Sequence, residues 1–136
     1  MRFILIIALV FPLLAQKGPA PVIEGVKKAC PKCVINTVKK EKEKGQTVYE
    51  VETKEGAISR DFMVKPDGSI LESEESIDAS TLPKAVADAI KAAHPKATIQ
   101  LAEKLTRGTE VLYEIALKDG GKKLSLTLDS AGKAQK

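Results

Sequence analysis

The chain has 136 residues, of which 43% are hydrophobic and 29% are charged, and its formal net charge is +4. That length suits one compact domain with a modest core. Basic residues alternate with acidic ones, as in residues 39–44 (KKEKEK), so they form no continuous basic block. Only 4% of the residues are aromatic, which leaves few side chains that can stack on bases. We therefore expect no nucleic-acid partner.

The first 15 residues have the pattern of a secretory signal peptide. Arg2 supplies the positive charge, an apolar run follows over residues 3–14, and a cleavage site ends at Ala15. A membrane anchor is the alternative, but Pro12 interrupts a run that is already shorter than the roughly 20 residues of a membrane-spanning helix. We expect a periplasmic or secreted protein with no stable membrane span after residues 1–15 are removed.

The rest of the chain contains an internal repeat with an offset of 64 positions. Pro31 and Pro95 define the offset, because 95 − 31 = 64. Without any gap, the same offset pairs Tyr49 with Tyr113, Glu50 with Glu114, Gly56 with Gly120, and Gly68 with Gly132. These matches fall on turn residues and on periodic apolar positions, which indicates duplication of a folding unit. We expect a first repeat over 16–72, a linker over 73–81 and a second repeat over 82–136.

The first repeat is predicted to be one helix followed by strands. Val22, Val26 and Ala29 recur at helical spacing, so a helix is expected over 19–29, before Pro31. Extended segments with strand-like residue patterns follow at 34–40, 46–53, 58–64 and 69–71. Arg60 interrupts the otherwise apolar face of the third segment. The acidic, serine-rich residues after these strands are predicted to form a solvated linker, because they lack the ligand spacing of a calcium loop.

The second repeat has the same order of elements. Val86 and Ile90 belong to the apolar stripe of a helix, and three strands are expected after it, at 98–105, 110–118 and 122–129. One repeat alone would bury little surface, so we expect the two repeats to share a core. The predicted fold is α+β: two tandem α-β-β-β(-β) repeats with antiparallel sheet or sheets and helices packed on one face.

Two arrangements of these strands remain open at this point: one continuous sheet, or two sheets packed together. In both, the polar side of the strands, with Glu50, Glu52 and Glu114, is expected to face water.

Several segments of the second repeat carry a family likeness: 82–86 (LPKAV), 93–97 (AHPKA), 112–115 (LYEI), 119–121 (DGG) and 131–133 (AGK). They resemble the PepSY-like repeat of exported bacterial proteins, a group related in fold to the beta-lactamase inhibitory protein. The resemblance is stronger in the second repeat than in the first. It implies an extracytoplasmic location and a protein-binding or inhibitory role without catalysis. No inhibitory residue carries over by motif, and the chain has no tryptophan to anchor an interface.

The segment Cys30-Pro31-Lys32-Cys33 is the one motif with chemistry of its own. In an exported protein, two cysteines at this spacing most often form a disulfide, which would restrict the unfolded chain by roughly 2 kcal/mol. A thiol redox couple shares the spacing but usually lies at a helix N-terminus, whereas the predicted helix here precedes the pair. A metal site would need further ligands. We predict that Cys30 and Cys33 form a structural disulfide, and they are also the candidate redox pair. We expect no metal and no cofactor.

The sequence offers no catalytic set. His94 is the single histidine and is interpreted as a partly exposed helix-end residue. Glu74 and Glu75 lie in the predicted linker, where they would not be held rigidly enough for acid/base catalysis. The leading interpretation is a non-enzymatic, exported binding module that presents a sheet face or its hairpin tips to an unknown protein or small ligand of the cell envelope. The alternative is a thiol redox or metal-handling protein centred on Cys30 and Cys33.

Overall fold

The structure, a computed structural model, describes residues 18–135, so the predicted signal peptide lies outside the described residues. The first half contains α1 (Ala20–Ala29), β1 (Val34–Glu43), β2 (Gln46–Glu55), β3 (Ile58–Val64) and β4 (Ile70–Ser76). The second half contains the short 3-10 turn η1 (Ala79–Thr81), α2 (Lys84–Ala93), β5 (Thr98–Arg107), β6 (Glu110–Asp119) and β7 (Lys122–Asp129).

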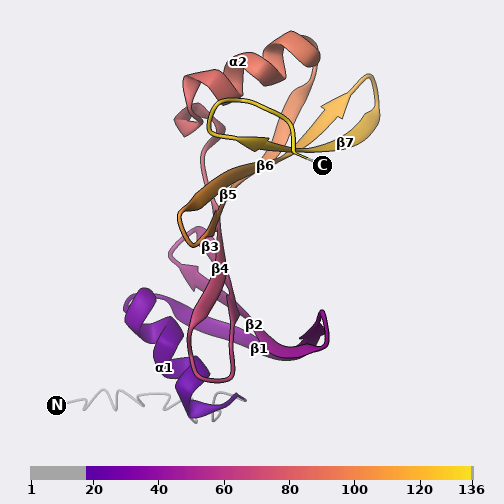
Figure 1. The fold of residues 1–136 in the computed structure, drawn as a ribbon. Coiled ribbons are helices and arrows are strands. Elements are labelled where there is room, and N and C mark those ends of the chain that lie inside the picture. The colour runs from indigo at the N-terminus through magenta and orange to yellow at the C-terminus, as the bar shows by residue number, and fades with distance from the viewer. Residues whose placement is uncertain (1–17, 136) are drawn as a thin grey trace, which may run out of the picture.

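All the strands belong to one antiparallel sheet. It has seven strands in the order β1-β2-β3-β4-β5-β6-β7, so each strand pairs with its neighbours in the sequence (Figure 1). The protein is therefore a small α+β fold built on an open sheet with two helices. Of the two arrangements that the sequence left open, the structure has the single continuous sheet.

Each helix buries one apolar stripe and ends shortly before a proline. Val22 and Val26 of α1 and Val86 of α2 are completely buried, at the spacing that places one face of a helix on a sheet. Pro31 and Pro95 follow the helix ends by two residues, where they disfavour continued helix. The helix predicted over 19–29 agrees with α1 to within one residue.

The expectation of a shared core is wrong, because the protein has two separate core clusters. The cluster around α1 consists of Val22, Val26, Cys30, Val51, Phe62 and Val64. The cluster around α2 consists of Leu82, Val86, Ile90, Ala102, Tyr113, Ile115, Leu117 and Leu128. The two helices lie at opposite ends of the sheet (Figure 1). The halves join edge to edge through β4 and β5 rather than face to face, so each helix covers only its own strands.

The predicted linker is also wrong over its first residues, since residues 73–76 belong to β4. This strand is hydrogen-bonded on both sides: Glu74 pairs with Asp61 of β3 and with Leu105 of β5. A polar, acidic sequence can form an inner strand here because strand pairing uses the backbone, and one face of an antiparallel sheet can remain in contact with water.

The two halves have the same strand register at the 64-residue offset. Val34 pairs with Lys54 in β1 and β2, and Thr98 pairs with Lys118 in β5 and β6. The ladder irregularity between residues 35 and 37 recurs between residues 99 and 101. After β7, the described chain adds only an isolated bridge between residues 128 and 134, so the second half has no full counterpart of β4.

A glycine in each half lets a turn approach the start of a helix. Gly68 has a φ of +90°, and a Cβ placed on it would lie 2.3 Å from the carbonyl oxygen of Pro21. Gly132, at the equivalent position, has a φ of +81°, and its Cβ would lie 2.4 Å from the carbonyl oxygen of Ala85. Both positions therefore require glycine, which explains why the two turn glycines match in the sequence.

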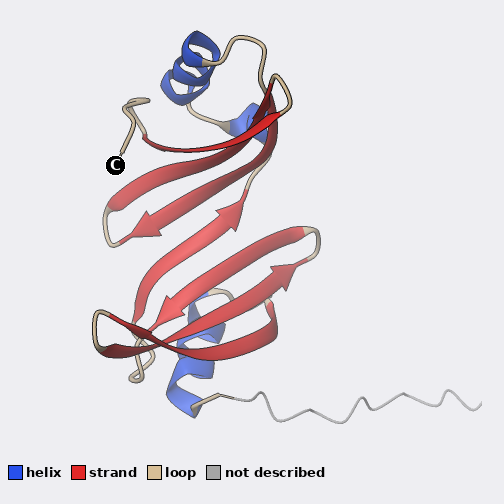
Figure 2. Cartoon of the chain, turned by 90° about the vertical axis from the view of Figure 1, so that its right-hand side faces the viewer, coloured by secondary structure: helices blue, strands red, loops and turns tan. Residues whose placement is uncertain are grey.

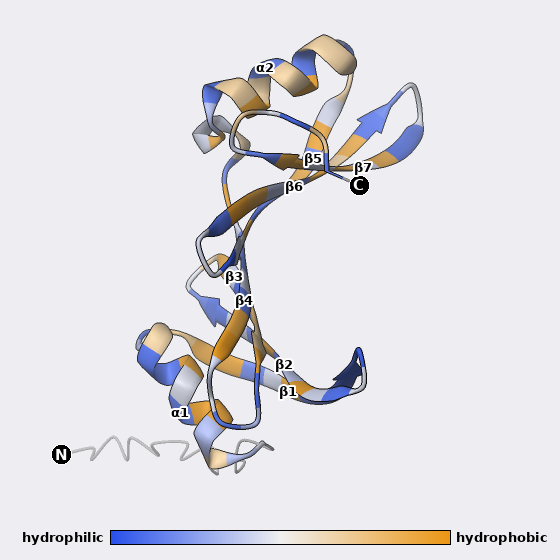
Figure 3. Ribbon diagram, in the orientation of Figure 1, coloured by the Kyte–Doolittle hydropathy of each residue, from blue (hydrophilic) through white to orange (hydrophobic). Residues whose placement is uncertain are grey.

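The sheet is curved, and its hollow face carries none of the helices of residues 18–135. Figure 2 looks toward this face, with the strands in front and α1 largely behind them. The hairpin tip between β1 and β2, which projects on the hollow side, is strongly hydrophilic (Figure 3). We call the side of the sheet opposite the two core clusters the open face.

Candidate functional site

Cys30 and Cys33 are joined in a disulfide between the end of α1 and the start of β1. Cys30 follows the last helical residue, and its backbone N–H still donates to the carbonyl of Val26 at 2.8 Å. The N–H of Cys33 then donates to the carbonyl of Cys30 at 3.1 Å, which closes a tight turn over Pro31. The helix end and this turn together bring the two Cα atoms to 5.3 Å, a separation suited to a disulfide.

Arg60 of β3 places its guanidinium against this disulfide. Its Nη1 lies 3.2 Å from Cys30 Sγ and 3.9 Å from Cys33 Sγ. Two carboxylates hold the same guanidinium: Nη1 donates to Glu55, and Nη2 donates to Glu75 Oε1 at 3.1 Å. The hydrogen bond to Glu75 raises the pKa of Arg60 above its ordinary value. Arg60 is therefore a fixed cation beside two sulfur atoms.

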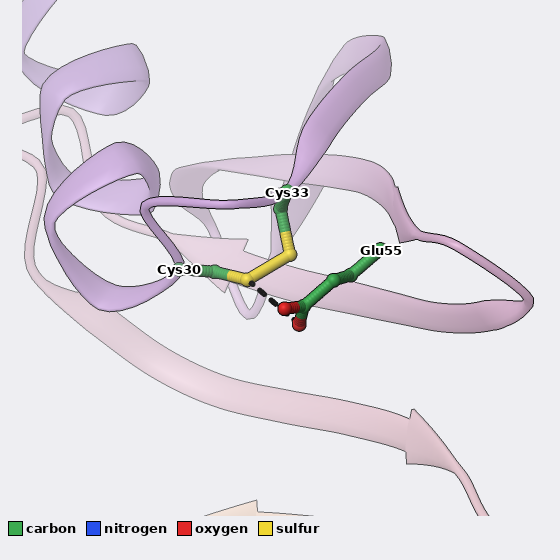
Figure 4. A group of neighbouring side chains, drawn as sticks. All are labelled: Cys30, Cys33 and Glu55. Atoms are coloured by element: carbon green, nitrogen blue, oxygen red, sulfur yellow. Dashed lines mark hydrogen bonds between the residues drawn. A yellow bond between two sulfur atoms is a disulfide. The ribbon is translucent and has the colours of Figure 1, made fainter.

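Glu55 approaches the disulfide from the end of β2. Its Oε2 lies 3.9 Å from Cys30 Sγ, as the dashed line in Figure 4 marks. Because a disulfide sulfur carries no hydrogen, this approach is a van der Waals and electrostatic contact and not a hydrogen bond. One ligand-type atom from each of Cys30, Cys33 and Glu55 lies within 4.8 Å of the others. The guanidinium of Arg60 contacts the same atoms, so a metal cation there would meet a positive charge.

The second half has a different contact at the equivalent place. His94, 64 positions after Cys30, follows α2, and its Nδ1 lies 3.0 Å from Oδ2 of Asp119, which is the equivalent of Glu55. The backbone is the same in both halves: the N–H of His94 donates to Ile90 at 2.8 Å, and the N–H of Ala97 donates to His94 at 3.1 Å. The prediction that His94 is a partly exposed helix-end residue agrees with its position and its 22% side-chain exposure.

The open face gathers carboxylates from most strands of the sheet. Strand alternation places the following acidic residues there: Glu50, Glu52, Asp61, Glu72, Glu74, Glu103 and Glu114. Several of them face one another directly across neighbouring strands. Glu52 pairs with Asp61, Asp61 pairs with Glu74, and Glu103 pairs with Glu114. Like charges at directly opposed positions destabilise a sheet, so the fold itself does not account for this pattern.

Glu74 lies at the centre of these carboxylates, and its pKa is raised to about 7. Partial burial is the main cause, followed by repulsion from Glu114, Glu103, Glu72 and Asp61. The pKa of Glu103 is raised for the same reasons: burial first, then the charges of Glu114 and Asp61. The pKa of Asp61 is also raised, by burial and then by Glu52 and Glu50. The centre of the open face, at Asp61, Glu74 and Glu103, therefore holds protons more tightly than isolated carboxylates do. Toward the edges of this face, Lys39 pairs with Glu50 and Arg107 pairs with Glu72.

Apolar side chains lie between the acids of the open face. Val48, Leu105 and Leu112 are 2%, 3% and 8% exposed although no helix covers them. Near Val48 the surface has a hollow of about 420 Å³. At its rim, Arg107 of β5 donates through Nε to Glu72 Oε2 of β4 at 2.8 Å. Because these apolar groups are buried on the side of the sheet that carries the acids, part of the open face is apolar.

The sequence revealed only part of these arrangements. It identified Cys30 and Cys33 and placed Glu50, Glu52 and Glu114 on the polar side of the strands, where the structure also has them. It missed the role of Arg60, although the interruption of an apolar face was a usable signal. The prediction that Glu74 and Glu75 are loosely held is wrong, because β4 fixes both.

None of the helices in residues 18–135 has the length and apolar character needed to cross a bilayer.

Comparison with known proteins finds similarity in structure alone. No family model matches the sequence, and no curated protein matches it. The fold is similar to that of a protein from Bacteroides eggerthii DSM 20697 named as a candidate periplasmic protein, with a TM-score of 0.72 and 14% identity over 88% of this chain and 86% of that chain. A DUF2874 family protein from Bacteroides ovatus ATCC 8483 gives a TM-score of 0.69 and 15% identity over 88% and 85% of the two chains. A BLIP-like protein from Bacteroides fragilis NCTC 9343 gives 0.67 and 16% identity over 88% and 84%. At these identities the similarity establishes the fold and no more.

Proposed function

We propose that the protein is an exported, non-catalytic binding module and that the open face of the sheet is its docking surface. The observation that carries this proposal is the concentration of carboxylates on the face of the sheet opposite both described helices, in a chain whose formal net charge is +4. Directly opposed acids cost stability when the protein is alone. A bound partner that neutralises them would recover that cost.

The partner that fits this face is a protein with a cationic surface patch. Lys and Arg side chains of such a partner would favour the charged form of Glu74, so docking near neutral pH would release protons. The three aromatic residues of the described chain, Tyr49, Phe62 and Tyr113, all pack with the core clusters. Without aromatic anchors on the open face, the interaction should depend on charge and weaken as salt is added.

The proposal also includes an exported location and an origin of the fold in two tandem repeats. The predicted signal peptide and the named periplasmic neighbour from Bacteroides eggerthii support an exported location. The equal strand register at the 64-residue offset supports two tandem repeats. The sequence segments of the second repeat, such as 93–97 and 112–115, are the ground for assigning them to the PepSY-like kind. The BLIP-like neighbour from Bacteroides fragilis supports a binding module over an enzyme. Nothing in the proposal requires a cofactor or a nucleic acid.

A charge-matched pair of variants tests the docking surface. At pH 8.5, above the raised pKa of Glu74, the double variant Glu74→Gln/Glu114→Gln removes two charges from the open face, and the control Glu24→Gln/Asp88→Asn removes two exposed charges from the helices. We expect the first to weaken binding of a cationic probe protein such as lysozyme at least tenfold by calorimetry at low salt, and the control to change it less than twofold. Equal losses in the two variants would show that binding follows net charge only and would refute a docking face.

A photo-crosslinking residue placed at Thr127 on the open face supplies a second readout. In cell-envelope preparations it should give a discrete adduct that disappears in the Glu74→Gln/Glu114→Gln background. The same residue placed at Lys91 on α2 should give no such adduct. An adduct from Lys91 alone would move the docking surface to the helical side.

A further inference from the structure

We propose that Cys30 and Cys33 form a thiol–disulfide exchange site in which an incoming thiolate attacks Cys33 and Arg60 receives the departing thiolate of Cys30. The proposal concerns the end of α1 and is independent of the open face. It rests on three observations: an equivalent turn without a disulfide, a cation held against the sulfur atoms, and the unequal burial of the two cysteines.

The disulfide is not needed to form this turn. The turn after α2 has the same pair of backbone hydrogen bonds, at 2.8 and 3.1 Å, although its equivalent positions are His94 and Ala97. A noncovalent contact between His94 and Asp119 ties the helix end to the sheet there. Because the fold closes the same turn without a covalent link, the geometry of the turn does not account for the two cysteines of the first half.

The cation beside the sulfur atoms is likewise specific to the first half. The position equivalent to Arg60 is Leu124, because 60 + 64 = 124, and Leu124 packs against the core of the second half. A neutral disulfide is a weak hydrogen-bond acceptor and gains little from a guanidinium at 3.2 Å. A thiolate at the same place would gain a charge-assisted hydrogen bond. Arg60 therefore stabilises the cleaved state more than the closed one.

The burial of the two cysteines sets the direction of attack. Cys30 is 5% exposed and belongs to the core cluster, whereas Cys33 is only partly buried. An external thiolate reaches Cys33 Sγ more easily, and the bond electrons then leave with Cys30 Sγ, next to Arg60. A depression of about 250 Å³ lined by Arg60 and Cys30 gives this thiolate room and access to protons from solvent. Exchange is faster when the leaving thiolate is stabilised.

The co-reactant is a dithiol, either a small molecule or an exported dithiol protein. Its first thiolate forms a mixed disulfide with Cys33 and releases Cys30 as a thiolate. The second thiolate of the dithiol then attacks the dithiol sulfur that is bonded to Cys33 and releases Cys33 as a thiolate. The dithiol is oxidised to a disulfide, and the protein takes up two electrons and two protons. The reverse sequence oxidises the protein again.

Glu55 and Arg60 should act on this exchange with opposite signs. Glu55 Oε2 lies 3.9 Å from Cys30 Sγ and disfavours a second negative charge there. We expect Arg60→Gln to slow reduction by dithiothreitol about tenfold, Arg60→Lys to restore most of the rate, and Glu55→Gln to increase the rate severalfold. Lys84→Gln removes an ion-paired cation from α2 in the other half and should leave the rate within twofold. Thiol titration gives the rates, and circular dichroism verifies the fold of each variant.

Two results would overturn the proposal in favour of a structural clip only. One is that Arg60→Gln and Glu55→Gln leave the rate within twofold of the wild type. The other is that Arg60→Gln and Glu55→Gln change the rate in the same direction, each in proportion to its loss of thermal stability. Trapping supplies an independent test: Cys30→Ser should form a mixed disulfide with oxidised glutathione through Cys33 faster than Cys33→Ser does through Cys30. The reverse order would contradict the assigned direction of attack.

Discussion

The two halves of the sheet share one backbone design but differ in how the end of the helix is tied to the strands. In the first half a disulfide, a glutamate and an arginine meet at this join, through Cys30, Glu55 and Arg60. In the second half a histidine–aspartate contact and a leucine occupy the equivalent positions. The backbone hydrogen bonds are the same in both. The backbone plan therefore fixes where the join lies, and the side chains decide whether it is a disulfide or a noncovalent contact.

The cores of the halves differ in size as well. The cluster around α2 has eight buried residues with seven partly buried ones against it, and the cluster around α1 has six with four. Because apolar burial is the main source of stability, the second half should be the more stable one. The predictions below test this difference, beginning with the largest expected effect.

The largest effect should follow truncation of the second core. Ile115 is completely buried, so Ile115→Ala should lower the free energy of unfolding by about 3 kcal/mol. Val51→Ala, the corresponding change in the first core, removes less volume and should cost about 2 kcal/mol. Denaturant titration measures both. In native-state hydrogen exchange, the amides of β6 in the wild type should be protected longer than those of β2, and the opposite order would contradict the assigned ranking of the halves.

Removal of the disulfide should have the next largest effect. The double variant Cys30→Ser/Cys33→Ser should lower the free energy of unfolding by about 2 kcal/mol, because the loop that the bond closes is short. The fold should persist, since the second half forms the same turn without a disulfide. Calorimetric melting under nonreducing conditions measures the loss. A variant that fails to fold would show that the first half depends on the bond in a way that the second half does not.

Replacement of Glu74 should raise the free energy of unfolding, in contrast to the two changes above, and the gain should depend on pH. Its folded pKa of about 7 exceeds the ordinary value of 4.5, so the folded state binds this proton more tightly than the unfolded state does. Glu74 therefore costs stability increasingly as the pH rises from about 4.5 to about 7, and the cost is complete above that range. Glu74→Gln should stabilise the protein by on the order of 1–2 kcal/mol at pH 8 and by almost nothing near pH 4.

Urea unfolding of the wild type and of Glu74→Gln at several pH values measures this difference in the free energy of unfolding. The control Glu24→Gln changes an exposed helix residue and should change the free energy of unfolding little. A stabilisation by Glu74→Gln that is equal at pH 4 and pH 8 would show that the pKa of Glu74 is not raised in the folded protein.

The smallest effect should come from the noncovalent join of the second half. His94→Ala removes the 3.0 Å contact with Asp119 and should cost about 1 kcal/mol, less than loss of the disulfide in the first half. Thermal unfolding of the variant beside the double cysteine variant provides the measurement. If His94→Ala lowers thermal stability more than Cys30→Ser/Cys33→Ser does, the disulfide is not the stronger of the two joins.

The sequence by itself determined the local plan of this protein. The helices, the strands, the hairpin glycines and the 64-residue offset all follow from periodicity and turn chemistry, which act over a few residues. Gly68 and Gly132 are good examples, because each is required by its own positive φ and by a nearby helix carbonyl. The pairing of Cys30 with Cys33 was predictable for the same reason, since the two lie within one turn.

The tertiary structure alone decided what depends on strand pairing. Residues 73–76 looked like a linker because their side chains are polar, but a strand is formed by its backbone, and β3 and β5 supply the partners on both sides. The gathering of Asp61, Glu74, Glu103 and Glu114 on one face and the approach of Arg60 to Cys30 join residues far apart in the sequence. No local pattern specifies such neighbours, because they are set by the register of hydrogen bonds across the whole sheet.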